Sequence, residues 1–206
     1  MQTKHILSAV TLALSATAMA DTATYTFEAP QFASGAPLPL NNIAPNSTSG
    51  PTLALLTTTF TANTSPSTIV VGSVPFSPPI TAQYLIEQTL VAGQLLQISL
   101  SQPVFTVDLD FVLNNTSGVS YLQFKDGGIT MNAPRTFTAT YDQGHLTYTN
   151  PTGLSSFTLE GFTPANTQIQ FAMDNLVVTV PEPASAALLG LGTLLLAARR
   201  RRSAQA

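Results

Sequence analysis

The stretch Val104-Phe105-Thr106-Val107-Asp108-Leu109-Asp110-Phe111 decides the fold class of this chain. Apolar and polar residues alternate along it, and successive side chains of a β-strand point to opposite faces of a sheet. Phe105, Val107, Leu109 and Phe111 should therefore face a core, whereas Thr106, Asp108 and Asp110 should face water. A strand with one packed and one wet face is typical of an antiparallel sheet.

Short runs of this kind recur throughout residues 21–180, separated by Pro, Gly and Asn, and helix signals are nearly absent. The pattern predicts an all-β domain, an antiparallel two-sheet jelly-roll-like sandwich. We expect strands at residues 23–28, 53–62, 68–74, 81–90, 94–100, 104–113, 119–124, 135–141, 145–149, 155–159 and 168–179. Residues 30–51 are rich in Pro, Gly and Asn and predict a long loop.

One hairpin is expected from its turn residues. Residues 137–141 should pair with residues 145–148 across Asp142-Gln143-Gly144, because Gly144 can adopt the left-handed conformation that a three-residue loop requires.

The N-terminus has the three regions of a secretory signal peptide. Lys4 precedes an apolar run, and Ala18 and Ala20 supply the small residues of a cleavage site before Asp21. We therefore expect residues 1–20 to be removed and residues 21–180 to form the exported domain.

The C-terminal region, which comprises Val180 and residues 181–206, has three parts. Val180, Pro181, Glu182 and Pro183 should be extended, because proline fixes φ and disfavours helix in the residue before it. Residues 184–198 are uncharged and predict a transmembrane helix of about 22 Å, short of the roughly 30 Å of a bilayer core. Four basic residues follow and should stay cytoplasmic: Arg199, Arg200, Arg201 and Arg202.

These three parts, in this order, resemble the PEP-CTERM sorting signal of exopolysaccharide-producing Gram-negative bacteria. The resemblance implies that an exosortase-type protease cuts near Pro181-Glu182-Pro183. It also implies export through the inner membrane, transient anchoring by the C-terminal helix, and a final place at the cell surface or outside the cell. The alternative is a plain C-terminal anchor that follows two prolines.

Charge and cysteine content exclude several classes of function. Residues 21–180 contain two basic and nine acidic side chains, so this region has no basic patch for nucleic acid. The chain has no cysteine, which excludes disulfides and thiolate metal sites. Charged residues make up 8% of the chain, so hydroxyl and amide groups must solvate its surface.

A calcium site is suggested at the two ends of the domain. Glu28 follows the first expected strand, and Asp174 and Asn175 lie in the last one. This placement resembles jelly-roll carbohydrate-binding modules, and the resemblance implies that these oxygen ligands share a structural Ca²⁺. The alternative is a polar bulge at Asp174-Asn175 and a solvated Glu28.

No catalytic set emerges, and we expect no enzyme. Asp108 and Asp110 share one wet strand face, without the contrast of an apolar and a solvated carboxyl that glycosidases use. His145 should be an exposed residue beside a turn, and no Gly-x-Ser-x-Gly motif is present.

Three functions follow in order of preference. The first is a structural or interaction component of the cell surface or extracellular polysaccharide matrix, as in a biofilm. The second is a carbohydrate-binding-module-like protein with Ca²⁺, for which Tyr84, Tyr121, Tyr141 and Tyr148 are the candidate stacking residues. The third is a glycan hydrolase.

Overall fold

A computed structural model describes residues 20–28, 32–50, 53–63, 69–72, 80, 84–87, 93–115, 119–133, 136–137 and 141–180. The described residues form thirteen β-strands, all of whose recorded pairings are antiparallel, which confirms the predicted fold class. Within this part of the chain no helix is long and apolar enough to cross a membrane. The predicted membrane helix and nearly all of the predicted signal peptide lie outside the described residues.

The strands have the following bounds: β1 Asp21–Tyr25, β2 Leu40–Ile43, β3 Ser47–Ser49, β4 Thr58–Ala62, β5 Ile69–Gly72, β6 Tyr84–Glu87, β7 Leu96–Leu113, β8 Tyr121–Asp126, β9 Ile129–Asn132, β10 Thr136–Phe137, β11 Asp142–Phe162, β12 Gln168–Ile169 and β13 Phe171–Val180. Residues Thr22–Val180 form one compact unit.

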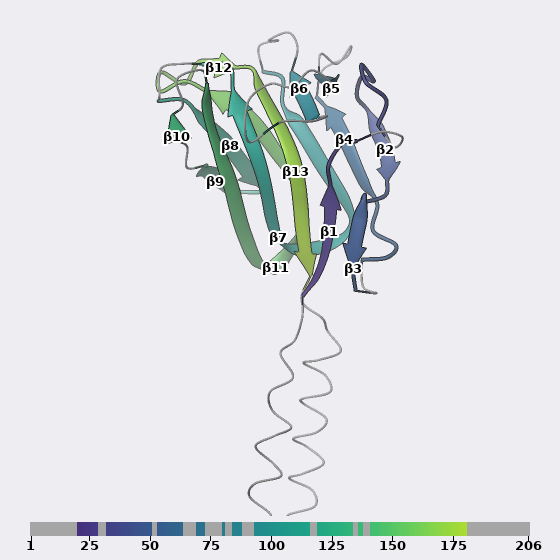
Figure 1. Cartoon of the computed structure of the whole chain (residues 1–206). Coiled ribbons are helices and arrows are strands. Elements are labelled where there is room, and N and C mark those ends of the chain that lie inside the picture. The colour runs from purple at the N-terminus through teal and green to yellow at the C-terminus, as the bar shows by residue number, and fades with distance from the viewer. Residues whose placement is uncertain are drawn as a thin grey trace, which may run out of the picture. The chain divides into compact units, whose positions relative to one another are not determined.

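Two long strands, β7 and β11, pair with each other along most of their length and contribute to both layers of the sandwich (Figure 1). In the first sheet, the order β3-β1-β13-β7-β11 uses the second half of β7 and the first half of β11. In the second sheet, β2 and β4 lie on one side of the first half of β7, and β8 and β9 lie beyond the second half of β11. The two sheets are therefore continuous through one bent ribbon.

The bend is built from an irregular pairing and a glycine. The register of β11 on β7 shifts between Thr149 and Leu154, and again before Ser156. Gly153 has φ +83°, and a Cβ there would lie 3.1 Å from Cβ of Pro103. Such irregularities let a strand turn a corner from one sheet to the other. The sequence predicted two pairs of separate strands here, and the structure joins each pair.

Three local predictions are wrong. Asp142, Gln143 and Gly144 lie inside β11, where Gly144 pairs with Phe111, so they are no hairpin loop. The hairpin turns earlier in the chain, because Thr136 pairs with Gln143. Residues 30–51 contain β2 and β3, and β9 was not predicted. These strands are short and lie at the sides of the sheets, where few apolar residues are needed to hold a strand.

The alternating stretch in β7 packs as predicted. Val107, Leu109 and Phe111 are fully buried, and Phe105 packs partly buried against the same core. A cluster of aromatic rings fills the core near the start of the domain, with Phe27 5.0 Å from Phe32 and 5.3 Å from Phe60 between ring centroids. The hydroxyl of Thr58 donates to the buried Tyr25 hydroxyl at 2.6 Å. The core thus lies between the two sheets and leaves both outer faces for polar residues.

Candidate functional site: two outer faces of the sandwich

The predicted calcium residues lie where strand β13 changes its neighbour. Ala172 and Met173 pair with β6, whereas β1 is the neighbour of β13 elsewhere along the strand. The register of β13 on β7 shifts between Asp174 and Val177, and Asn175 has φ 51°. Asp174 and Asn175 therefore belong to a β-bulge, which is the alternative that the sequence also allowed.

Asp174 is buried among other acidic groups. It is 4% exposed, and its cross-strand partner is Asp110. Burial is the main reason that the pKa of the Asp174 carboxyl is raised to about 7. A backbone hydrogen bond from Asn175 lowers this pKa, and the charges of Glu28 and Asp110 raise it. That bond joins the Asn175 amide to Asp174 Oδ1 at 2.7 Å.

Asp110 and Asp108 are held by neighbours from other strands. Asn175 Nδ2 donates to Asp110 Oδ2 at 2.9 Å. His145 Nδ1 lies 2.9 Å from Asp110 Oδ1, and its Nε2 lies 3.5 Å from Asp108 Oδ1. Thr147 Oγ1 donates to Asp108 Oδ1 at 2.6 Å. We call this group the carboxylate face: Asp108, Asp110, His145, Thr147, Asp174 and Asn175.

The carboxylate face lies on the solvent side of the first sheet, as predicted for Asp108 and Asp110. Their side chains are 28% and 22% exposed. His145 is exposed as predicted, but it lies within β11 rather than beside a turn. In the described part of the chain, no three His, Asp or Glu side chains are placed so that they could hold a metal ion. The calcium site stays a prediction.

The outer face of the second sheet has a different chemistry. Leu122, Phe124 and Leu159 point into the core, so the residues between them point outward. Cross-strand register places these outward residues in rows across β7, β11, β8 and β9. We call them the amide face: Gln97, Tyr121, Gln123, Lys125, Asn132, Thr158, Glu160 and Phe162.

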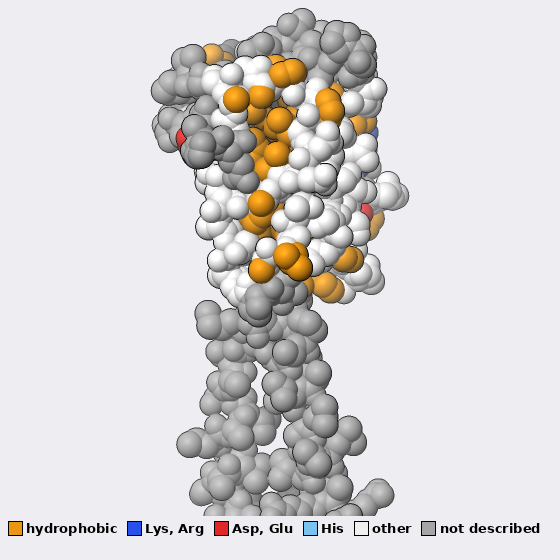
Figure 2. Space-filling view, turned by 90° about the vertical axis from the view of Figure 1, so that its right-hand side faces the viewer, with side chains coloured by type: hydrophobic (Ala, Val, Ile, Leu, Met, Phe, Trp, Pro, Cys, Tyr) orange, Lys and Arg blue, Asp and Glu red, His pale blue; other side chains and the backbone are white. Residues whose placement is uncertain are grey.

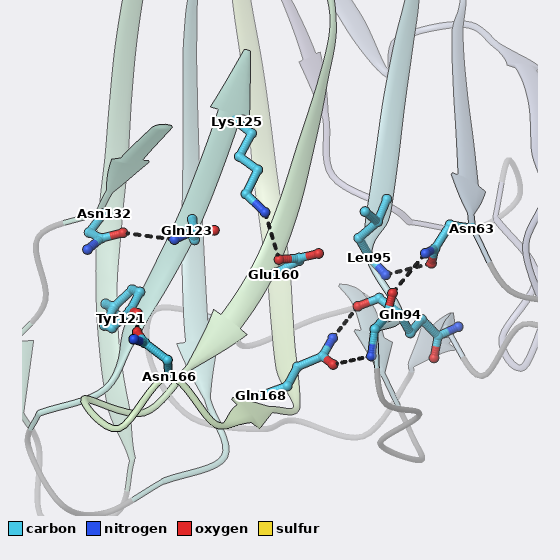
Figure 3. Close-up of polar contacts among 11 residues, drawn as sticks. Asn63, Gln94, Leu95, Tyr121, Gln123, Lys125, Asn132, Glu160, Asn166 and Gln168 are labelled. Carbon is cyan, nitrogen blue, oxygen red and sulfur yellow. Dashed lines mark hydrogen bonds and ion pairs between the residues drawn. The ribbon is translucent and has the colours of Figure 1, made fainter. Parts of the chain in front are cut away.

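The charges of the amide face cancel. Lys125 Nζ lies 3.1 Å from Glu160 Oε2, and the Glu160 side chain is only 10% exposed (Figure 3). Gln123 Nε2 donates to Asn132 Oδ1 at 3.5 Å in the next row. A nearly buried carboxylate requires such a partner, and its neutralisation leaves a face of amides and hydroxyls.

An aromatic pair lies at one end of the amide face. The rings of Tyr121 and Phe162 are stacked, with centroids 5.8 Å apart and planes at 28°. The Tyr121 hydroxyl donates to Asn166 Oδ1 at 2.6 Å, and Asn166 takes φ 58° in the turn before β12 (Figure 3). Of the predicted stacking residues, Tyr121 lies on this face, whereas Tyr84 is buried.

The sequence did not identify Phe162, because the expected strand ended at residue 159. Gly161 weakened the strand signal, yet the structure explains it: a Cβ there would lie 2.6 Å from the Ile169 carbonyl oxygen of β12. Alternation of Thr158, Glu160 and Phe162 with apolar residues was the signal that could have found this part of the face.

Two amide side chains secure the backbone beside the aromatic pair. Gln168 Oε1 accepts from the Gly93 amide at 2.7 Å, and Gln168 Nε2 donates to the Gln94 carbonyl (Figure 3). Asn63 Oδ1 accepts from the Leu95 amide at 2.8 Å, and its Nδ2 donates to the Gly93 carbonyl at 2.8 Å. The chain entering β7 is thereby fixed next to the amide face.

The surface on the β2 and β3 side is also poor in charge. Figure 2 shows this side, where uncharged polar groups and apolar patches dominate and few acidic or basic side chains are visible. Leu40 and Ile43 of β2 pack partly buried against the core, and Leu55 is 89% exposed. Low charge is thus a property of more than one side of the domain.

The end of the chain matches a known family model. Residues 179–202 match the PEP-CTERM protein-sorting motif. The chain carries a PEP-CTERM sorting motif. The match begins at Thr179, within the last two residues of β13, and it confirms the resemblance stated from the sequence. The PEP-CTERM motif indicates export and membrane-associated sorting. The comparison of the chain with curated proteins found no match.

Three of the solved structures that match this chain have low TM-scores. A family 29 carbohydrate-binding module is 10% identical, with 60% of this chain and 92% of that chain covered and a TM-score of 0.33. The xylan-binding CBM22-1 domain of Paenibacillus barcinonensis Xyn10C is 14% identical, with 72% and 99% covered and a TM-score of 0.35. The enzymatically active domain of bacteriophage CBA120 tailspike protein 4 is 15% identical, with 60% of this chain covered and a TM-score of 0.32. The match spans only 19% of that tailspike chain. The carbohydrate binding and enzymatic activity named in these descriptions are those of the matched proteins.

Proposed function

We propose that this protein is an exported, non-enzymatic component of the cell surface or the extracellular polysaccharide matrix. The sorting motif at residues 179–202 supports the route. On this route the C-terminal helix holds the chain in the inner membrane until an exosortase-type protease cuts near Pro181-Glu182-Pro183. The folded domain then remains at the surface or leaves the cell.

The amide face is the proposed contact with polysaccharide. The observation that carries this proposal is the stacked pair Tyr121 and Phe162 beside rows of amide and hydroxyl side chains. Sugar rings stack on aromatic faces, and sugar hydroxyls exchange hydrogen bonds with amides. Lys125 and Glu160 neutralise each other, so the face offers no free charge to an ionic polymer.

The polymer that fits this face is uncharged. The domain of residues 21–180 has nine acidic and two basic side chains, and its field repels polyanions. A polymer rich in uronic acids would therefore bind more weakly than a neutral one, most clearly at low ionic strength.

Binding of the purified protein to a panel of neutral and acidic polysaccharides tests the proposal. We expect retention by at least one neutral polymer and a loss of about tenfold in affinity in Tyr121→Ala, the size of one lost stacking contact. Thr149→Ala, an exposed change on the other sheet, is the control. Undiminished binding by Tyr121→Ala would show that the polysaccharide contacts another part of the domain. If no polysaccharide of the panel bound, a purely structural role would be left.

A calcium-dependent carbohydrate-binding protein is the second candidate. Its support is electrostatic: the charges of Glu28 and Asp110 raise the pKa of Asp174, and a hard cation would offset these like charges. Because no three acidic or histidine side chains of the described residues form a metal-binding group, backbone carbonyls and water would have to supply the remaining ligands. Thermal unfolding with calcium and with a chelator is the test. A higher midpoint with calcium, abolished in Asp174→Asn, supports the site, and an unchanged midpoint removes it.

A further inference from the structure

The sorting motif and the folded domain overlap by two residues. The motif match begins at Thr179, and strand β13 ends at Val180. Thr179 pairs with Thr106 of β7, and Val180 is 7% exposed within the hydrophobic core cluster. These two residues therefore belong to the sheet as well as to the motif.

Strand β13 lies in the interior of the first sheet. It pairs with β7 along one edge, and β1 and β6 are its neighbours along the other. Val178, two residues before the end, is fully buried. A protease binds its substrate as a free extended segment, so residues in a strand that is paired on both edges become accessible only through local unfolding.

We propose that β13 sets the upstream limit of processing: Thr179 and Val180 serve the fold, and the protease acts only on the chain from Pro181 onward. The first bond it can cut is the one between Pro181 and Glu182. This inference rests on the proposed function, because it assumes that the motif is processed. The folded domain sets how far upstream the protease can cut, and the residues after Val180 are the ones that the protease recognises.

The limit has a structural consequence for the released protein. Cleavage at or after the bond between Pro181 and Glu182 leaves all of β13 in place, so both sheets survive processing. Cleavage within residues 171–179 would remove part of an interior strand and expose buried side chains such as Val178.

The C-terminal residue of the released protein tests the limit directly. The full chain is produced in cells that contain the processing protease, and the mass of the released form is measured. We expect the released chain to end at Pro181 or a later residue. A chain ending at Val180 or before overturns the proposal. Absence of any release counts against the proposed processing instead.

Two variants separate the roles of the neighbouring residues. Val180→Ala should lower the midpoint of thermal unfolding without slowing release, since Val180 serves the core. Glu182→Gln should leave the midpoint unchanged and slow release about tenfold, the size of one lost charge-assisted hydrogen bond. Slower release by Val180→Ala with an unchanged midpoint would make Val180 a recognition residue and overturn the proposal.

A third measurement does not depend on the processing protease. The purified full chain is trimmed with a protease of broad specificity, and the C-terminus of the resistant core is read by mass. We expect the core to end at Pro181 or beyond. A core ending at Val180 or before would show that the end of β13 opens freely, and it would overturn the proposed limit.

Discussion

The two outer faces of the sandwich are made by the same two long strands, yet their chemistry differs. On the first sheet, β7 and β11 present Asp108, Asp110 and His145, and β13 adds the buried Asp174. On the second sheet, the other halves of β7 and β11, together with β8 and β9, present amides, hydroxyls and one neutralised ion pair. One face collects titratable groups, and the other collects neutral ones.

Because of this difference, pH should change the charge of the carboxylate face, whereas a neutral ligand should contact the amide face. The carboxylate face places like charges close together, so the protonation of Asp174 is linked to stability. The amide face has no such linkage from a free charge, and its contacts should depend little on pH. The bend at Gly153 makes the separation possible, because it carries one ribbon into both sheets.

The largest effect should come from breaking the bend. Gly153→Val places a β-branched residue at φ +83°, with its Cβ 3.1 Å from Pro103. We expect a loss of about 3 kcal/mol in the free energy of unfolding, from backbone strain and overpacking together. Urea unfolding measures it. Gly128→Val, at an open turn glycine without positive φ, is the control, and equal losses in both variants would contradict a special role for the bend.

The next effect distinguishes the carboxylate face by pH. The pKa of Asp174 is about 7 in the fold, above its ordinary value of 3.8, so between these values the native chain holds a proton that the unfolded chain releases. Stability should therefore fall as pH rises from about 4 to about 7, by ~2 kcal/mol once solvent screening is allowed for.

Asp174→Asn should remove this pH dependence and stabilise the protein at pH 8. Thermal unfolding between pH 4 and 8 is the measurement, and Asp108→Asn should keep the slope. The prediction would be contradicted if the stability of the wild-type chain rose between pH 4 and 7 and Asp174→Asn abolished that rise. The pKa of Asp174 would then be lowered by folding rather than raised.

A smaller effect distinguishes the amide face. Lys125→Met leaves the nearly buried Glu160 without its partner, and we expect a loss of about 1.5 kcal/mol, because Lys125 itself is 38% exposed. Adding Glu160→Leu should recover most of the loss. Chemical denaturation of the two variants measures it, and an equal loss in the double variant would mean that packing, not charge, is responsible.

The smallest effect concerns the aromatic pair. Tyr121→Phe keeps the ring but removes the bond to Asn166, and we expect about 0.5 to 1 kcal/mol of destabilisation with polysaccharide binding largely retained. Calorimetric unfolding and the binding panel give both values. Binding lost as fully as in Tyr121→Ala would assign the contact to the hydroxyl rather than to the ring.

The local alternation of apolar and polar residues predicted many of the strands, but it did not predict correctly where the chain turns between them. The strand with Val107 and Leu109 was predicted with its correct inward face, because side-chain period is a local property. The hairpin was misplaced because Gly144 can adopt a turn, yet here it pairs with Phe111. Turn propensity is a weak local preference, and pairing with a distant strand overrides it.

The candidate sites were predicted less completely. Asp174, Asn175 and Asp110 were each singled out by the sequence, but only register brings Asp110 opposite Asp174. Phe162 and Glu160 were missed because the expected strand ended at residue 159. Their contacts with Tyr121 and Lys125 join two strands, so they could not be read from the chain. Charge and aromatic content can be read from a chain, but adjacency across strands cannot.

The sequence by itself determined the sorting motif of this protein and its fold class. The sorting motif is a linear signal, and strand alternation depends only on neighbouring residues, so both are visible without coordinates. Tertiary structure alone decided that one ribbon serves two sheets, that Asp174 is buried beside other acids, and that Val180 belongs to the core. These depend on long-range pairing and burial, which arise only when segments distant in the chain pack together.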